Sequence, residues 1–136
     1  DLSGKTVLDF GCGSGILAIA AGKLGAGRVA GVDVDPQALR ASEANARANG
    51  VGARFAAPDG LAAGSFDIVV ANILANPLIL LAPILAERVA VPGRIALSGI
   101  LVDQADAVAA AYAPWFKLGQ WRERDGWVLL VGERSA

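Results

Sequence analysis

The 136-residue sequence contains no histidine and no methionine, and Cys12 is its only cysteine. Without histidine, neither histidine metal ligation nor histidine acid–base catalysis is available within the chain, and we expect no metal site. A single cysteine cannot form an internal disulfide, which is typical of a reducing compartment such as the cytoplasm. Because methionine is missing, we interpret residues 1–136 as one domain of a longer protein.

Clusters of one charge and long apolar runs are missing as well. The 12 basic and 13 acidic residues are scattered and give a net charge of −1, so we expect no direct nucleic-acid binding. The longest apolar run, "ANPLILLAPILAERVAV", is interrupted by Pro77, Pro83, Glu87 and Arg88. These interruptions argue against a membrane span, and no signal peptide is visible.

Apolar residues make up 54% of the chain, and short apolar runs alternate with helix-forming segments. The patterns predict strands at 6–10, 28–33, 53–58, 66–73, 93–100, 116–124 and 126–134, and helices at 16–24, 36–50, 77–89 and 103–113. We expect Pro83 to kink the third helix. The alternation predicts an α/β fold with a largely parallel sheet, and Asp125-Gly126 predicts an antiparallel hairpin at the end of the chain. No domain boundary is evident.

The stretch "VLDFGCGSG", residues 7–15, places Gly11, Gly13 and Gly15 between the first strand and the first helix. Ligands of open α/β sheets bind at this edge, and glycine lets a ligand approach the backbone closely. The spacing differs from the dinucleotide fingerprint G-x-G-x-x-G, because its third glycine position is occupied by Ile16. The phosphate-binding pattern G-x-x-x-x-G-K fails for want of a lysine. We predict a cofactor turn, with a turn that binds nothing as the alternative.

Two carboxylates belong to this pattern. Asp9 lies two residues before Gly11, and Asp33 ends the second strand 22 residues beyond Gly11, where a carboxylate can accept hydrogen bonds from ribose hydroxyls. The alternative for Asp33 is a helix cap, but Asp35, just before Pro36, is better placed for capping.

The G-x-G-x-G spacing behind Asp9 resembles motif I of the class I S-adenosylmethionine-dependent methyltransferases. The resemblance implies a Rossmann-like seven-stranded sheet of order 3-2-1-4-5-7-6 that binds S-adenosylmethionine. The cofactor contacts that we infer are Asp9, Gly11, Cys12, Gly13, Gly15, Asp33, Val34, Asp59 and Asn72. For Asp59, which would bind the adenine amino group, a solvated loop acid is an equally open interpretation.

Four stretches together resemble one family of this class, the ribosomal protein methyltransferases often called PrmA. They are "LDFGCGSGILAIAAGKLGA", "GVDVDPQALRASEANARANGV", "DIVVANILANPL" and "LSGILVDQADAV". The resemblance implies methylation of amino groups on large-subunit ribosomal protein eleven, with Asn72 as the catalytic residue between cofactor and amine. Ile73, Leu74 and Pro77 would line a dry slot for that amine. The alternative for Asn72 is a turn residue that ends a strand.

The family also has an N-terminal recognition domain and a threonine-containing segment that covers the cofactor, and neither corresponds to any part of this sequence. We therefore expect weaker cofactor binding and poor methylation of the ribosomal protein by these 136 residues alone. Other hypotheses stay open: a methyltransferase acting on another protein or a small amine, an NAD(P)-dependent oxidoreductase domain, or a cofactor-binding module without activity.

Overall fold

The computed structural model describes residues 2–61 and 63–134. Its contacts divide the chain into two compact units, Asp1–Phe66 and Asp67–Ala136. The expectation of a single domain over residues 1–136 stays a prediction.

The described strands form a seven-stranded sheet with the order β3-β2-β1-β4-β5-β7-β6. The pairs β1–β2 and β2–β3 are parallel, whereas β5–β7 and β6–β7 are antiparallel. This arrangement confirms the α/β class, the strand order and the terminal hairpin that the sequence predicts.

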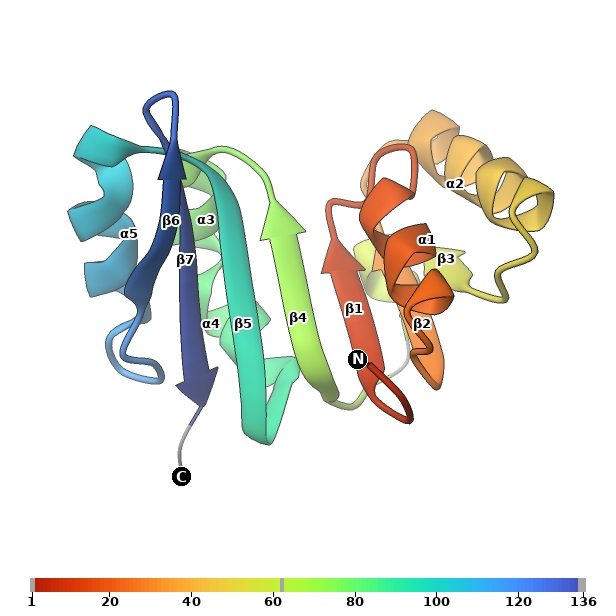
Figure 1. The fold of residues 1–136 in the computed structure, drawn as a ribbon, viewed down its shortest axis with the longest axis horizontal. Coiled ribbons are helices and arrows are strands. Elements are labelled where there is room, and N and C mark those ends of the chain that lie inside the picture. The colour runs from red at the N-terminus through yellow and green to blue at the C-terminus, as the bar shows by residue number, and fades with distance from the viewer. Residues whose placement is uncertain (1, 62, 135–136) are drawn as a thin grey trace. The chain divides into compact units, whose positions relative to one another are not determined.

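The first unit consists of β1 (Thr6–Phe10), α1 (Ile16–Lys23), β2 (Arg28–Val32), α2 (Pro36–Ala48), β3 (Arg54–Ala56) and the short 3-10 helix η1 (Pro58–Gly60). The three central residues of β1 and four of the five residues of β2 are buried, as expected of strands covered on both faces. Their register aligns Phe10 with Val32, so the two strands end side by side. Helix α1 packs on β1 and β2, and α2 contacts β3 (Figure 1).

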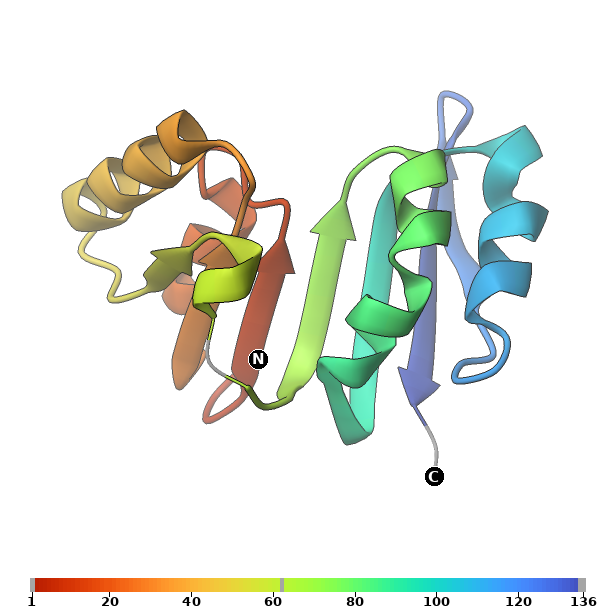
Figure 2. The same ribbon diagram turned by 180° about the vertical axis from the view of Figure 1, so that it is seen from behind.

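The second unit consists mainly of β4 (Phe66–Asn72), α3 (Ala75–Leu80), α4 (Ala82–Glu87), β5 (Val89–Leu101), the 3-10 helix η2 (Val102–Gln104), α5 (Ala105–Tyr112), β6 (Gly119–Arg124) and β7 (Trp127–Arg134). Helices α3, α4 and α5 lie on the same face of its strands (Figures 1 and 2). The core lies beneath them and includes Ile95, Leu97 and Leu130. Tyr112 is fully buried there, and its hydroxyl donates to the carbonyl oxygen of Leu78 over 2.7 Å.

Most differences from the sequence-based boundaries lie in the second unit. The helix expected at 77–89 is two helices that meet at Leu81, and Pro83 occupies the first turn of α4, where its missing N–H costs no helical hydrogen bond. Strand β5 is longer than 93–100 and contains a bulge between Leu97 and Ile100. Strand β6 begins at Gly119, three residues later than the predicted start at residue 116. Within the described residues, no helix has the length and apolarity needed to cross a membrane.

Candidate functional site

The glycine turn between β1 and α1 is built from backbone conformations that side chains disfavour. Gly11, Gly13 and Gly15 have φ values of 81°, 56° and 87°. The backbone N–H groups of Gly11 and Cys12 both donate to the carbonyl of Val32, over 2.7 and 2.9 Å, and so fasten the turn to the end of β2. A Cβ atom on Gly13 would meet nothing within 4 Å, so this face of the turn is open to a ligand.

Asp33 follows β2 and contacts this turn directly. Its Oδ2 accepts from the backbone N–H of Gly13 at 2.9 Å, and its Oδ1 accepts from the N–H of Asp35 at 3.0 Å. Each carboxylate oxygen has a further lone pair, and the residue is partly exposed, so two hydroxyl donors can still be accepted. Asp35 is the N-cap of α2, since its side chain accepts from the N–H of Gln37 over 2.9 Å. The capping role predicted for Asp35 is thus confirmed.

Asp9 lies in β1 immediately before the turn and is 1% exposed. Burial raises its pKa to about 6; the backbone N–H of Ala18 lowers it, and the nearby charge of Asp33 raises it. Its Oδ2 accepts no hydrogen bond from the described residues. The carboxylate is therefore enclosed beside the turn, and the cofactor contact predicted for Asp9 stays a prediction.

The other predicted cofactor residues of this unit differ in exposure. The Cys12 side chain is buried, and burial is the main cause of its raised thiol pKa. Val34 is 83% exposed and Asp59 is exposed in η1. The contacts predicted for these residues stay predictions.

Two polar residues of α2 also hold the turn, and the sequence had not assigned them to the site. The Ser42 hydroxyl donates to the carbonyl of Gly13 at 2.8 Å, and the Asn45 side-chain amide donates to the carbonyl of Ser14 at 2.9 Å. Ser42 lies four residues before Ala46 on the buried face of α2, where a polar group needs a partner.

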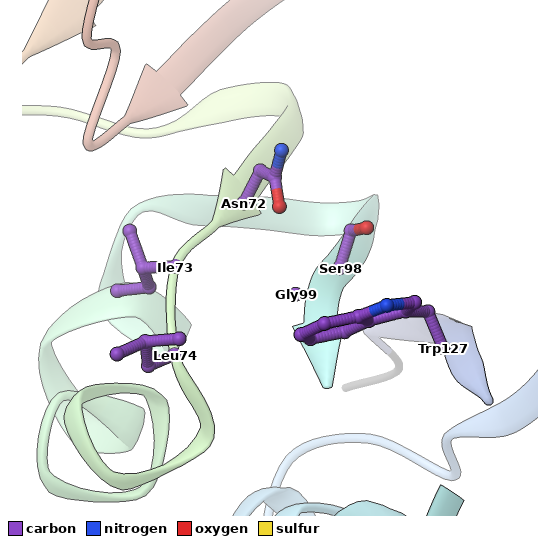
Figure 3. Close-up of a pocket in the computed structure, with 6 residues that line it drawn as sticks. All are labelled: Asn72, Ile73, Leu74, Ser98, Gly99 and Trp127. Atoms are coloured by element: carbon purple, nitrogen blue, oxygen red, sulfur yellow. The ribbon is translucent and has the colours of Figure 1, made fainter. Parts of the chain in front are cut away.

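Asn72 belongs to the second unit, where it is the last residue of β4 and is exposed. It lines a cavity of about 470 Å³ together with Ile73, Leu74, Ser98, Gly99 and Trp127. Figure 3 shows the Trp127 indole on one side of this cavity and Ile73 and Leu74 on the other, with their side chains extending away from the indole. The backbone of residues 73–74 therefore faces the ring.

Gly99 brings β5 close to the end of β4. It lies in the bulge with φ 84°, and a Cβ atom there would be 2.6 Å from the carbonyl oxygen of Ile73 and 3.0 Å from Oδ1 of Asn72. Two hydrogen-bond acceptors therefore lie beside the same cavity residue. Only glycine permits both this conformation and this approach.

A second cavity of about 280 Å³ shares Leu74, Gly99 and Trp127 with the first. Pro77 lines the second cavity rather than the first. The sequence-based interpretation had missed Trp127, which is 47% exposed at the start of β7. Because Trp127 is far from Asn72 along the chain, no short pattern links the two residues. The sequence showed only an aromatic residue directly after the Asp125-Gly126 turn. Among the described residues, no cluster of side chains fits a metal ion.

Comparison with known proteins gives a consistent result. The family model described as "Ribosomal protein L11 methyltransferase (PrmA)" matches residues 1–135. Proteins named ribosomal protein L11 methyltransferase from Cupriavidus necator and Bordetella parapertussis are each 59% identical over 133 residues, which is 98% of this chain and 44% and 43% of theirs. The chain therefore spans less than half the length of these curated relatives.

A crystal structure described as ribosomal protein L11 methylase from Lactobacillus delbrueckii subsp. bulgaricus superimposes with a TM-score of 0.91 at 35% identity, covering 99% of this chain and 72% of that one. A methyltransferase from Pyrococcus furiosus, at 17% identity and a TM-score of 0.83, shares the fold over 98% of this chain and 77% of its own. With a family match over nearly its whole length, the chain belongs to the ribosomal protein L11 methyltransferase (PrmA) family.

Proposed function

We propose that this chain is the S-adenosylmethionine-binding catalytic domain of an enzyme that methylates amino groups of ribosomal protein L11. The names of its relatives support this substrate. The observation that carries the cofactor assignment is the charge of the glycine turn: Asp9 and Asp33 adjoin it, and residues 9–15 and 33–35 contain no basic residue.

This charge favours a cationic cofactor. S-adenosylmethionine supplies, when bound, a methyl group activated by a positively charged sulfur. The open face of Gly13, the spare lone pairs of Asp33 and the unsatisfied Oδ2 of Asp9 fit a ligand that has ribose hydroxyls and positive charge. The pyrophosphate of NAD would be repelled by the same carboxylates, and Ile16 occupies the position of the third fingerprint glycine.

We assign the incoming amine to the cavity beside Asn72. An amine must be neutral to accept a methyl group, yet a lysine has an ordinary pKa of about 10.4 and an α-amine about 7.7–8.0. Apolar walls such as Trp127 disfavour the charged form and lower that pKa. The Asn72 amide oxygen accepts a hydrogen bond and orients the amine, but an amide is too weak a base to remove the proton, and the chain contains no histidine. Proton loss therefore precedes methyl transfer.

The test uses the full-length protein. We expect calorimetric titration to show binding of S-adenosylhomocysteine and none of NADH, and radiolabelled methyl groups to pass to ribosomal protein L11. Binding of NADH alone would identify an oxidoreductase domain. Methylation of a small amine or of a different protein, but not of L11, would overturn the substrate assignment. Cofactor binding without transfer to any acceptor would identify a module without activity.

A further inference from the structure

Three side chains from outside the glycine turn hold three consecutive peptide groups within it. Asp33 accepts from the N–H of Gly13 at 2.9 Å, Ser42 donates to the carbonyl of Gly13 at 2.8 Å, and Asn45 donates to the carbonyl of Ser14 at 2.9 Å. Gly13 is thus held at both its N–H and its carbonyl. A peptide chain that is rich in glycine would otherwise be free to rotate here.

The two donors come from one face of α2. Ser42 and Asn45 are three residues apart and therefore neighbours on the helix surface. Ser42 is fully buried, and a Cβ atom on Gly15 would come within 3.1 Å of it, so the space around its hydroxyl is tightly limited. Asp35, which follows Asp33, caps the same helix. The position of α2 is thereby coupled to the acid that we assign to the ribose.

We propose that Ser42 and Asn45 are positioning residues for the cofactor, acting through the backbone of the glycine turn. This inference rests on the proposed function. With both carbonyls bonded to α2, neither oxygen turns toward the ligand face of the turn, and the conformation that binds exists before the ligand arrives. Preorganisation of this kind improves affinity because less ordering is needed on binding.

Asn45 offers the cleaner test, because its side chain is exposed whereas loss of the buried Ser42 hydroxyl would also destabilise the fold. The same helix offers a matched control. Asn49 is also exposed and also donates its side-chain amide to a backbone carbonyl, but that carbonyl belongs to Asn45 within α2 and not to the turn. Asn45→Asp and Asn49→Asp each remove one amide donor and add one negative charge.

In the full-length protein, we expect Asn45→Asp to weaken binding of S-adenosylhomocysteine by about 3- to 10-fold, the range for losing one hydrogen bond. The KM for S-adenosylmethionine should rise by a similar factor while kcat at saturation is unchanged. Asn49→Asp should change both quantities less than twofold. Asn45→Ala and Asn49→Ala repeat the comparison without the added charge.

A purely structural role gives a different result. Partial unfolding lowers the active fraction and hence the apparent kcat, but leaves KM unchanged. Such a pattern in the Asn45 variants, or equal affinities in the Asn45 and Asn49 variants, would overturn the positioning role. Failure of the wild-type protein to bind S-adenosylhomocysteine would instead overturn the proposed function, so the two failures are distinguishable.

Discussion

The candidate sites of the two units differ in how they are built. In the first unit the candidate site is a turn of backbone fixed by hydrogen bonds, flanked by an enclosed carboxylate and a partly exposed one. In the second unit it is an open cavity in which Asn72 is exposed, Leu74 is 66% exposed and Trp127 is 47% exposed. A small charged ligand suits the first arrangement, and a side chain with an apolar stem and one polar end suits the second. On this comparison, substitutions in the first unit should change cofactor affinity, and substitutions in the second should change turnover or substrate KM.

The largest effect is expected at Asp33. Asp33→Ala removes the acceptor that we assign to the ribose and also frees the N–H of Gly13. At about 1.5–3 kcal/mol for a hydrogen bond to a charged group, the loss of cofactor binding free energy should be about 2–4 kcal/mol after allowing for non-additivity. Calorimetry with S-adenosylhomocysteine measures it.

Asp35→Ala is the matched control for Asp33. It removes the cap of α2, which should lower the free energy of unfolding by about 1 kcal/mol, and should leave cofactor affinity within about threefold. If Asp33→Ala weakens cofactor binding less than tenfold, Asp33 is a solvated acid and its assignment to the ribose is wrong.

The next effect concerns turnover. Asn72→Ala in the full-length enzyme should lower kcat on the order of 10²-fold, the scale for misplacing a reacting group, with little change in binding of S-adenosylhomocysteine. Single-turnover methylation with radiolabelled cofactor measures the rate. Ser98→Ala, which removes a hydroxyl from the same cavity, should cost less than about fivefold. Wild-type rates in the Asn72 variant would show that Asn72 only ends β4 and has no role in methyl transfer.

A third prediction concerns the buried acid of the first unit. The pKa of Asp9 is about 6 in the folded protein, against an ordinary value of 3.8. Between these values the folded protein binds more protons than the unfolded chain, so the contribution of Asp9 to the free energy of unfolding falls as the pH rises from about 4 to 6 and is level above that. The total change is about 3 kcal/mol.

Urea denaturation at a series of pH values, compared with Asp9→Asn, isolates this contribution. We expect the wild-type protein to lose stability relative to the variant as the pH rises through this range. A constant difference between the two proteins from pH 4 to 7 would show that the carboxylate is not enclosed as the structure describes.

The smallest effect is expected at the wall of the open cavity. Trp127→Leu should raise the KM for the protein substrate about fivefold, because the indole covers more of the apolar stem of the substrate side chain than leucine does, a difference of about 1 kcal/mol. Trp121→Leu is the control, since Trp121 lies in the same hairpin, is 64% exposed and pairs with the guanidinium of Arg122 rather than with either cavity. Equal KM values in the two variants would remove Trp127 from the substrate site.

The difference between local contacts and contacts made through strand pairing explains which features the sequence predicted. The turn, Asp33 and the Asp35 cap depend on glycine conformations and on neighbours a few residues apart, so short patterns revealed them. Trp127 reaches the Asn72 cavity through the antiparallel pairing of β5 with β7, which aligns it with Leu101. The long strand β5 and the break at Leu81 likewise depend on tertiary packing. The resemblance to known methyltransferases supplied the strand order and Asn72, which composition and periodicity alone would not have given.

Gly99 sets a limit on how the amine cavity can vary. Its positive φ excludes most side chains, and the carbonyl of Ile73, 2.6 Å from where a Cβ would lie, excludes the rest. The ends of β4 and β5 can therefore approach each other this closely only because Gly99 has no Cβ atom. Substitution of Trp127 can change one wall of the cavity, but widening the cavity at position 99 would require moving the backbone of both strands.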